Sequence, residues 1–225
     1  MSLWTVPRMW NGDCWIIGGG ISMLHQFGVP SEVIARVEKG ELPFSSYSSF
    51  LSPLHSKNVI GTNIAFTLGG WVDVFYFCDA RFFLDHWELI IKFPNLKVTC
   101  VGHLSNQLQP MTTEIKRLKR DYQPGLSAEP GTIRWNFNTG AAAINFAVLA
   151  GAQRILLLGF DMNGGQKTHW HNVYKEPTHR FDFQRFLKFY PAIAREAKRM
   201  KVEILNVSPN SALDVFPRVS LKEVL

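Results

Sequence analysis

The stretch FNTGAAAINFAVLAGAQRILLLGFDMNGG, residues 137–165, decides the fold that the sequence predicts. Residues 142–149 are small and apolar, as in a buried helix, and Gly151 can end that helix. The apolar run at 154–160 is typical of a buried strand, and it stops at Asp161. The stretch therefore predicts a helix, a tight turn, a strand and a loop, which is the repeating unit of an α/β protein.

Polar residues flank this unit at the two places where α/β proteins bind ligands. Asn138, Thr139 and Gly140 would lie at the start of the helix, where free N–H groups and the helix dipole favour an anion. Asp161 would lie just beyond the carboxyl end of a central strand, the edge where open α/β sheets place their ligands. A helix cap and a turn aspartate explain the same residues equally well.

Length and composition indicate one domain over residues 1–225, of which 46% are hydrophobic. No apolar run approaches the roughly 20 residues of a membrane-spanning helix, and residues 1–12 lack the apolar core of a secretory signal. Cys14, Cys78 and Cys100 are odd in number and lie in strand-like runs. We therefore expect no membrane span, and buried thiols in a reducing, cytoplasmic compartment.

The charge of the chain is compatible with an anionic partner. The formal net charge is +6 and the pI is near 9.3. A nucleotide, a nucleic acid and an anionic glycan would all suit such a protein, so the charge alone does not choose among them.

A second candidate ligand site follows the first apolar strand, CWIIG at 14–18, which runs directly into the glycine turn Gly18–Ser22. Glycines at that junction let a phosphate or ribose approach the backbone closely, and Ser22 could donate to the ligand or cap the next helix. The dinucleotide fingerprint fails, because Met23 replaces its third glycine and the second strand ends in Thr62 and Asn63 with no acidic residue. A turn that only permits the strand-to-helix geometry is the alternative.

The remaining pattern predicts a three-layer α/β/α, Rossmann-like domain with a mostly parallel sheet of about six strands. Further strands are expected at 58–61, 73–78, 97–101 and 202–207, and helices at 31–39, 80–92 and 182–200, the last kinked at Pro191. Residues 41–57 would form a lid-like loop, and residues 104–132 an irregular insertion with a short helix around 114–120.

Several polar groups follow these strands and would meet at one rim of the sheet, as at a nucleotide-binding cleft. They are Gly18–Ser22, Asn63, Asp79, Asp161 and Ser208–Ser211.

Histidines are concentrated in the loop after the central strand. His169, His171 and His179 lie there beside Trp170 and Tyr174. A histidine over the ligand edge can act as a general base, a phosphate donor or a metal ligand. No cysteine or glutamate stands at zinc-like spacing from the His-x-His pair, so no metal site is predicted.

The segments IIGGGISM, VIGTN, VDVFYFCDARFF, NTGAAAINFAVLAGAQRILLLGFDM, PTHRFDFQRFLKFY and SPNSAL, in this order, resemble the bacterial sialyltransferases of the small α/β/α type. They are equally similar to the relatives grouped with motility accessory factors, archaeal pterin pyrophosphokinases and bacteriophage proteins of unassigned role. The KTHWH loop is closest to the phage and motility-factor branch. The resemblance extends from residue 14 to about residue 216.

This resemblance implies an inverting transferase that needs no metal or other cofactor. Gly18–Ser22, Asn63 and Asn138–Gly140 match the positions that hold a cytidine monophosphate sugar in the sialyltransferases. His179 matches the histidine that acts there as general base on the acceptor hydroxyl.

The chain departs from the sialyltransferase pattern at two places. Gly19 stands where the family has an asparagine. The loop after the central strand carries Asn163, Lys167, His169 and His171 in place of the tyrosine pair that meets the leaving phosphate. A lysine or histidine cation could fill that role.

The leading hypothesis is therefore a glycosyltransferase that uses a CMP-sugar-like donor and a glycan or another hydroxyl acceptor, with no nucleic-acid partner. A homo-oligomer is compatible with this hypothesis. One alternative is pyrophosphoryl transfer to a pterin-like alcohol, which would need Mg²⁺ on Asp79 or Asp161. The other is a phage binding or assembly protein that keeps the fold without catalysis.

Overall fold

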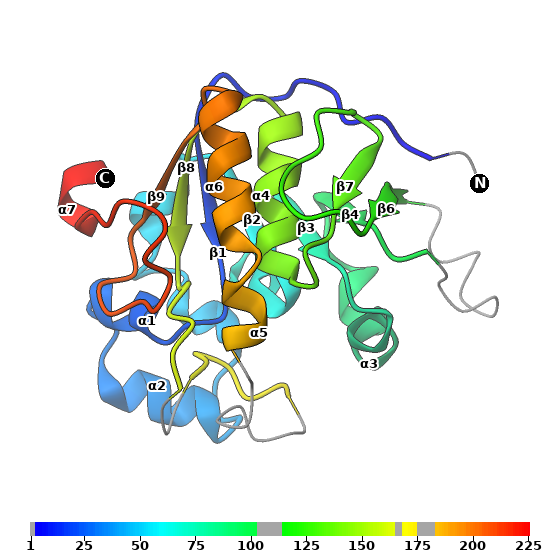
Figure 1. Ribbon diagram of the computed structural model, residues 1–225. Helices are drawn as coiled ribbons and strands as arrows, with labels where there is room; N and C mark the ends of the chain where they lie inside the picture. The colour runs from blue at the N-terminus through cyan, green and yellow to red at the C-terminus, as the bar shows by residue number, and fades with distance from the viewer. Residues whose placement is uncertain (1–2, 103–113, 165–167, 175–182) are drawn as a thin grey trace.

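The computed structural model describes residues 3–102, 114–164, 168–174 and 183–225. Its centre is a seven-stranded sheet in the order β5-β4-β3-β2-β1-β8-β9, in which neighbouring strands run parallel (Figure 1). The predicted α/β fold with a mostly parallel sheet is confirmed, with seven strands in place of about six. The strands are β1 (Gly12–Ile17), β2 (Val59–Thr62), β3 (Val74–Phe77), β4 (Leu96–Thr99), β5 (Ile115–Arg117), β8 (Ala152–Leu158) and β9 (Glu203–Asn206).

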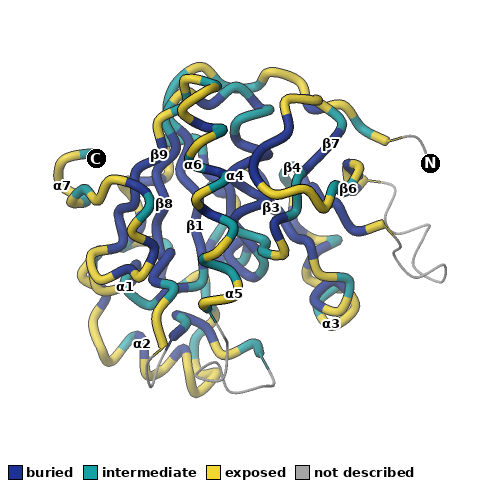
Figure 2. The backbone as a smooth tube through the Cα atoms, viewed as in Figure 1, coloured by how far each residue is buried: buried dark blue, intermediate teal, exposed yellow. Residues whose placement is uncertain are grey.

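Helices cover both faces of the sheet because successive residues of its strands point to opposite sides. Ile16 of β1 packs with α4 (Thr139–Leu149) and α6 (Tyr190–Arg199), while Trp15 and Ile17 pack with α1 (Ser22–Gln26), α2 (Ser31–Glu38) and α3 (Ala80–Ile90). Figure 2 shows the buried sheet between these outer layers. The described residues also form α5 (Gln184–Leu187) and α7 (Leu221–Val224).

Among the helices that the structure describes, α4 is the most deeply buried. Its alanines at 141–143 and 147 are buried and keep the helix thin enough to lie close to the sheet. Its one buried polar side chain, Asn145, has hydrogen-bond partners: Oδ1 accepts from the N–H groups of Ser127 and Arg134, and Nδ2 donates to the Ser127 carbonyl. Gly151 follows with φ 99°, a conformation that glycine adopts without strain, so the predicted helix end is confirmed.

Two local predictions are wrong. The helix expected around 114–120 is replaced by β5, which pairs with β4, and by β6 (Lys119–Asp121), which pairs with β7 (Thr132–Arg134) in a small second sheet. The free edge of β4 supplies backbone partners that outweigh the weak local preference for helix.

The helix expected over 182–200 is also divided, into α5 and α6. Pro191 lies in the first turn of α6, where its missing N–H costs nothing, and therefore does not kink a continuous helix.

The segment 41–57, expected as a lid-like loop, contains η1 (Phe44–Tyr47) and η2 (Ser52–Leu54). Tyr47, Leu51 and Leu54 are fully buried in the core beneath β1 and β3. A third 3₁₀ helix, η3 (Asn63–Leu68), follows β2. Across the described segments, no helix combines the length and the apolar character that a bilayer crossing requires.

Candidate functional site

A cavity of about 1100 Å³ opens at the carboxyl ends of the parallel strands. In Figure 1 this is the edge toward which the arrows of β1 and β8 point. The residues directly after β1, β2, β3 and β8 contribute to its wall, as does the start of α4. Eleven of the residues expected at a site lie in this wall: Gly18, Gly19, Gly20, Asn63, Asp79, Asn138, Thr139, Gly140, Asp161, His169 and His171.

Other expected residues lie elsewhere. Asn163 is exposed outside the cavity wall, and its Nδ2 donates to the Asn210 carbonyl at 2.6 Å. Ser208 and Ser211 bind the backbone of Phe160 and so brace the end of β8. His179 and Lys167 fall outside the described residues, so their roles stay predictions.

The glycine turn is packed against other parts of the protein. A Cβ atom on Gly18 would lie 2.6 Å from the Gly159 carbonyl oxygen, one on Gly19 2.5 Å from His169 Cδ2, and one on Gly20 2.5 Å from Asp161 Cγ. Such distances are shorter than any ordinary carbon contact. The packing of the domain therefore favours glycine at all three positions whatever ligand the turn binds, most strongly at Gly18, where the neighbour is a backbone oxygen.

Asp161 holds this turn in place from the end of β8. Its two carboxylate oxygens accept hydrogen bonds from the backbone N–H and the hydroxyl of Ser22, at 3.0 and 2.5 Å. Ser22 is the first residue of α1, so Asp161 places a carboxylate at the positive end of that helix. The interaction explains how Asp161 can be buried, with an exposed fraction of 8%, because both of its oxygens accept hydrogen bonds.

The start of α4 is a capped helix end. Asn138 Oδ1 accepts from the N–H of Ala141 at 2.9 Å and from the Tyr190 hydroxyl at 3.2 Å, so the cap is a structural role of this residue. The N–H groups of Thr139 and Gly140 belong to the first turn, which leaves them without acceptors inside the helix. A Cβ atom on Gly140 would lie 2.7 Å from the Phe160 ring, so packing favours glycine here too.

Asp79 has the corresponding role at α3. Its carboxylate accepts from the N–H of Arg81 at 2.8 Å and caps the helix. The residue is exposed at the cavity wall.

A short strap, residues 168–171, lies across the glycine turn. Trp170 donates from its backbone N–H to Gly19 O at 2.9 Å and from its indole Nε1 to Gly18 O at 2.8 Å. Its ring is fully buried and makes edge contacts with Phe44 and Tyr47. The buried tryptophan thus fixes the two histidines on either side of it at the cavity wall.

Burial keeps both of these histidines neutral. It lowers the pKa of His169 to about 4, and it lowers the pKa of His171 well below its ordinary value, with smaller effects from His169 and His86. The His169 and His171 rings lie 5.2 Å apart, and each contacts the Tyr174 ring at about 5 Å. At neutral pH this cluster can exchange hydrogen bonds and accept a proton, but it carries no fixed positive charge.

Two buried polar atoms of the wall have no hydrogen-bond partner within the described structure: His171 Nδ1 and Asn63 Oδ1. The other end of the Asn63 amide donates to the Tyr174 hydroxyl at 3.2 Å, and the backbone of Asn63 is left-handed with φ 49°. Unpaired buried polar atoms are rare in folded proteins and are expected where a ligand supplies the partner. These two atoms are the strongest local indication of a binding site.

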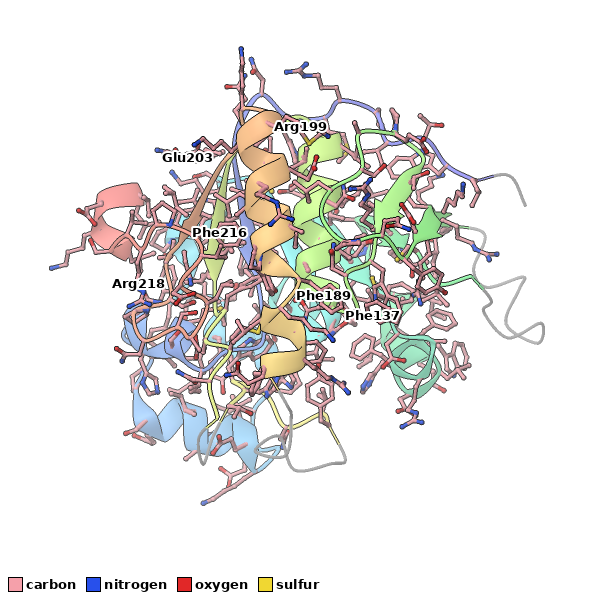
Figure 3. All side chains as sticks on the ribbon, in the orientation of Figure 1. Phe137, Phe189, Arg199, Glu203, Phe216 and Arg218 are labelled. Carbon is pink, nitrogen blue, oxygen red and sulfur yellow. The ribbon has the colours of Figure 1, made fainter. Side chains whose placement is uncertain are left out.

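Several wall residues were not expected from the sequence. Arg120 of β6 and the aromatic residues Trp135 and Phe137 line the side of the cavity next to α4. Asn136 and Phe137 both have positive φ, 52° and 53°, which is strained for residues other than glycine. The sequence WNF at 135–137 contains no glycine, so the turn could not be predicted from it. In Figure 3, Phe137 and Phe189 lie side by side below α4 and α6, and their rings stack at 5.2 Å.

The described residues contain no group of three or more His, Cys, Asp or Glu side chains arranged to hold a metal ion. The three cysteines are buried free thiols, as predicted.

Among solved structures, the chain is similar to the monofunctional alpha-2,3-sialyltransferase Cst-I from Campylobacter jejuni, with a TM-score of 0.50 and 13% identity over 92% of this chain and 80% of that one. It is also similar to a variant of the sialyltransferase CST-II in complex with CMP, with a TM-score of 0.50 and 12% identity over 92% and 86%. The chain has a sialyltransferase-like fold. No protein-family model and no curated protein matches its sequence.

Proposed function

We propose that this protein transfers a sugar from a nucleotide-activated donor to a hydroxyl group of an acceptor glycan, with inversion and without a metal ion. The observation that carries the proposal is the cavity at the carboxyl edge of the sheet, with unpaired buried polar atoms and two neutral histidines in its wall. The similar CST-II structure holds CMP, which supports a CMP-sugar as the donor class.

The donor would lie along the wall from the glycine turn to α4. The Gly18–Gly20 backbone and the first N–H groups of α4, at Thr139 and Gly140, would bind the nucleotide. Asn63 Oδ1 is available to accept from a ribose hydroxyl or a base amine.

The reaction requires a base that removes the proton of the acceptor hydroxyl. That oxygen then attacks the anomeric carbon as the bond to the donor phosphate breaks, which inverts the configuration. His179 is the proposed base, on the strength of the family resemblance. His171 is the alternative, because its neutral ring presents an unpartnered Nδ1.

The test has two steps. CMP, UMP, AMP and GMP are first compared by the rise in melting temperature that each produces, since a ligand at 100 times its Kd adds about 2.7 kcal/mol of stability. Transfer is then assayed with the matching nucleotide sugars and a glycan array, with and without a chelator. We expect CMP to bind and transfer to survive chelation.

The control is His25→Gln, at an exposed histidine that does not line the cavity. It should bind and transfer as the unaltered protein does. Failure of every nucleotide to bind the unaltered protein would overturn the proposal, and a strict requirement for Mg²⁺ would favour pyrophosphoryl transfer.

A further inference from the structure

One side of the cavity wall carries a cation that the sequence did not predict there. Arg120 lies there on β6, next to the ends of β3 and β4. Its Nε donates to Cys100 O at 3.0 Å and its Nη2 donates to Cys78 O at 2.6 Å. The two carbonyl groups belong to the residues that follow β4 and β3, so the guanidinium is held at the carboxyl edge of the sheet.

The position of this guanidinium is also fixed by an aromatic ring. The Arg120 Cζ atom lies 4.1 Å from the centroid of the Trp135 ring, within the range of a cation–π contact. Trp135 in turn donates its backbone N–H to Asp121 O at 2.9 Å, which ties the ring to β6 itself. Arg120 is therefore a preorganised, partly buried cation rather than a flexible surface side chain.

The charge of Arg120 has no carboxylate partner among the described residues. The neighbouring Arg134 forms an ion pair with Asp121, and Arg154 forms one with Asp13, whereas the partners of Arg120 are two carbonyl groups, the Cys100 thiol and the Trp135 ring. The hydrogen bond with Cys78 and the nearby guanidinium lower the pKa of Cys100 to about 7. A guanidinium has five N–H groups, more than its two bonds to carbonyls and its contact with the Cys100 thiol use. A partly buried cation with spare donors, at the wall of a ligand-sized cavity, is suited to an oxyanion.

The histidines cannot supply this charge. His169 and His171 are neutral at pH 7, because burial lowers the pKa of each. The other arginines of the cavity wall, Arg81 and Arg185, are exposed, and Arg185 packs on the Phe186 ring. Among the arginines that the structure describes in the wall, Arg120 alone is both partly buried and anchored at the strand ends.

We propose that Arg120 is the oxyanion-binding residue of the cavity and that it holds the phosphate of the donor nucleotide. The identity of the anion as a nucleotide phosphate rests on the function proposed above; the oxyanion site itself rests on the geometry of Arg120. In the transfer reaction, the positive charge would stabilise the phosphate as it gains negative charge on leaving the sugar.

The experiment compares CMP with cytidine, which differ by the phosphate alone, in the unaltered protein and in Arg120→Gln. We expect CMP to bind the unaltered protein more tightly than cytidine does. The variant should lose roughly 10- to 100-fold in CMP affinity, as for charge-assisted hydrogen bonds, with cytidine affinity unchanged. Inorganic phosphate and acetate, at matched ionic strength, serve as probes without a base, and only phosphate should raise the melting temperature in an Arg120-dependent way.

Arg195→Gln is the charge-matched control, because Arg195 is exposed on α6 outside the cavity wall, and it should behave as the unaltered protein does. Arg120→Lys keeps the positive charge but lacks the planar guanidinium. Each variant is compared with its own melting temperature in the absence of ligand, so that a loss of stability is not mistaken for a loss of binding. A CMP-to-cytidine ratio unchanged in Arg120→Gln overturns the assignment and leaves the proposed function standing.

Arg120-dependent binding of phosphate without binding of any nucleotide supports the oxyanion site and overturns the proposed function. If acetate raises the melting temperature as much as phosphate does, the site is not specific for phosphate, and the phosphate assignment is overturned. If neither CMP nor phosphate binds the unaltered protein, both proposals fall.

Discussion

The two sides of the cavity differ in what occupies the space beside the backbone. On the glycine-turn side, Gly18–Gly20 are closely covered by the end of β8, by Asp161 and by His169, and the histidines there are neutral. On the side next to α4, Arg120 keeps spare N–H donors. A glycine-rich turn is therefore not in itself a phosphate site. Close packing between protein segments demands the same residues, and the charge lies on the other side.

The largest expected effect is the loss of turnover when the general base is removed. It shows whether the histidines on the glycine-turn side take part in proton transfer. His179→Ala should lower turnover by roughly 10²- to 10⁴-fold with donor affinity nearly intact, as for loss of a general base. His171→Gln should lower it by only about tenfold, the value of one hydrogen bond. Steady-state kinetics with saturating donor measures both. The reverse order would place the base in the strap over the glycine turn.

The second effect is a pH dependence of stability that comes from His169. Its pKa is about 4 in the folded protein and near 6.5 when unfolded, so the unfolded chain binds more protons between these values. The free energy of unfolding contributed by neutral His169 is fully present above pH 6.5 and is lost as the pH falls toward 4, by about 3 kcal/mol in all.

Urea unfolding at pH 7 and at pH 4.5 should therefore show a smaller difference in His169→Gln than in the unaltered protein. An equal difference in the two proteins would mean that His169 is not buried against the glycine turn.

The third effect concerns the packing at Gly18. Gly18→Ala should destabilise the fold by about 1–3 kcal/mol, because its Cβ would meet the backbone oxygen of Gly159, which cannot turn away as a side chain can. Gly70→Ala is the matched control, since a Cβ there has no neighbour within 4 Å, and it should have little effect. Chemical denaturation measures both. Similar stability of the two variants would show that packing does not require glycine at position 18, and that only ligand binding could do so.

The smallest effect concerns the bond that ties the turn to β8. Ser22→Ala removes the hydroxyl that donates to Asp161 and should cost about 1 kcal/mol of unfolding free energy, while the backbone N–H still donates. Ser45→Ala, at an exposed serine, should change little. A neutral result at Ser22 would show that the backbone bond alone holds the turn.

The sequence predicts the architecture well because parallel strands leave strong local signals. The runs at 14–17, 74–77 and 155–158, which form most of β1, β3 and β8, are apolar because both of their faces are covered. Once these strands are parallel, the residues that follow them must meet at one edge, so the position of the cavity was predictable from Gly18, Asn63, Asp79 and Asp161.

The positions of β5, β6 and Arg120 depend on contacts between segments that are distant in the chain, and a single sequence does not reveal these contacts. The strands β5 and β6 contain Lys116, Arg117 and Lys119, and they form because β4 and β7 offer backbone partners. Arg120 becomes a cavity residue only through the carbonyl ends of β3 and β4, some 20 to 40 residues earlier in the chain. The roles of Asn163 and His179, the cytoplasmic location and a homo-oligomer stay predictions.

Binding of a nucleotide against the neutral histidines of this cavity can be followed in the NMR spectrum of the histidine rings during titration with CMP. The imidazole signals of His169 and His171 should shift in a saturable manner, while those of exposed His25 and His55 stay in place. Nucleotide binding at this site is contradicted if CMP saturates the protein while the His169 and His171 signals stay in place. It is also contradicted if CMP does not bind at concentrations up to about 10 mM, since a Kd of 1 mM already corresponds to only about 4.1 kcal/mol.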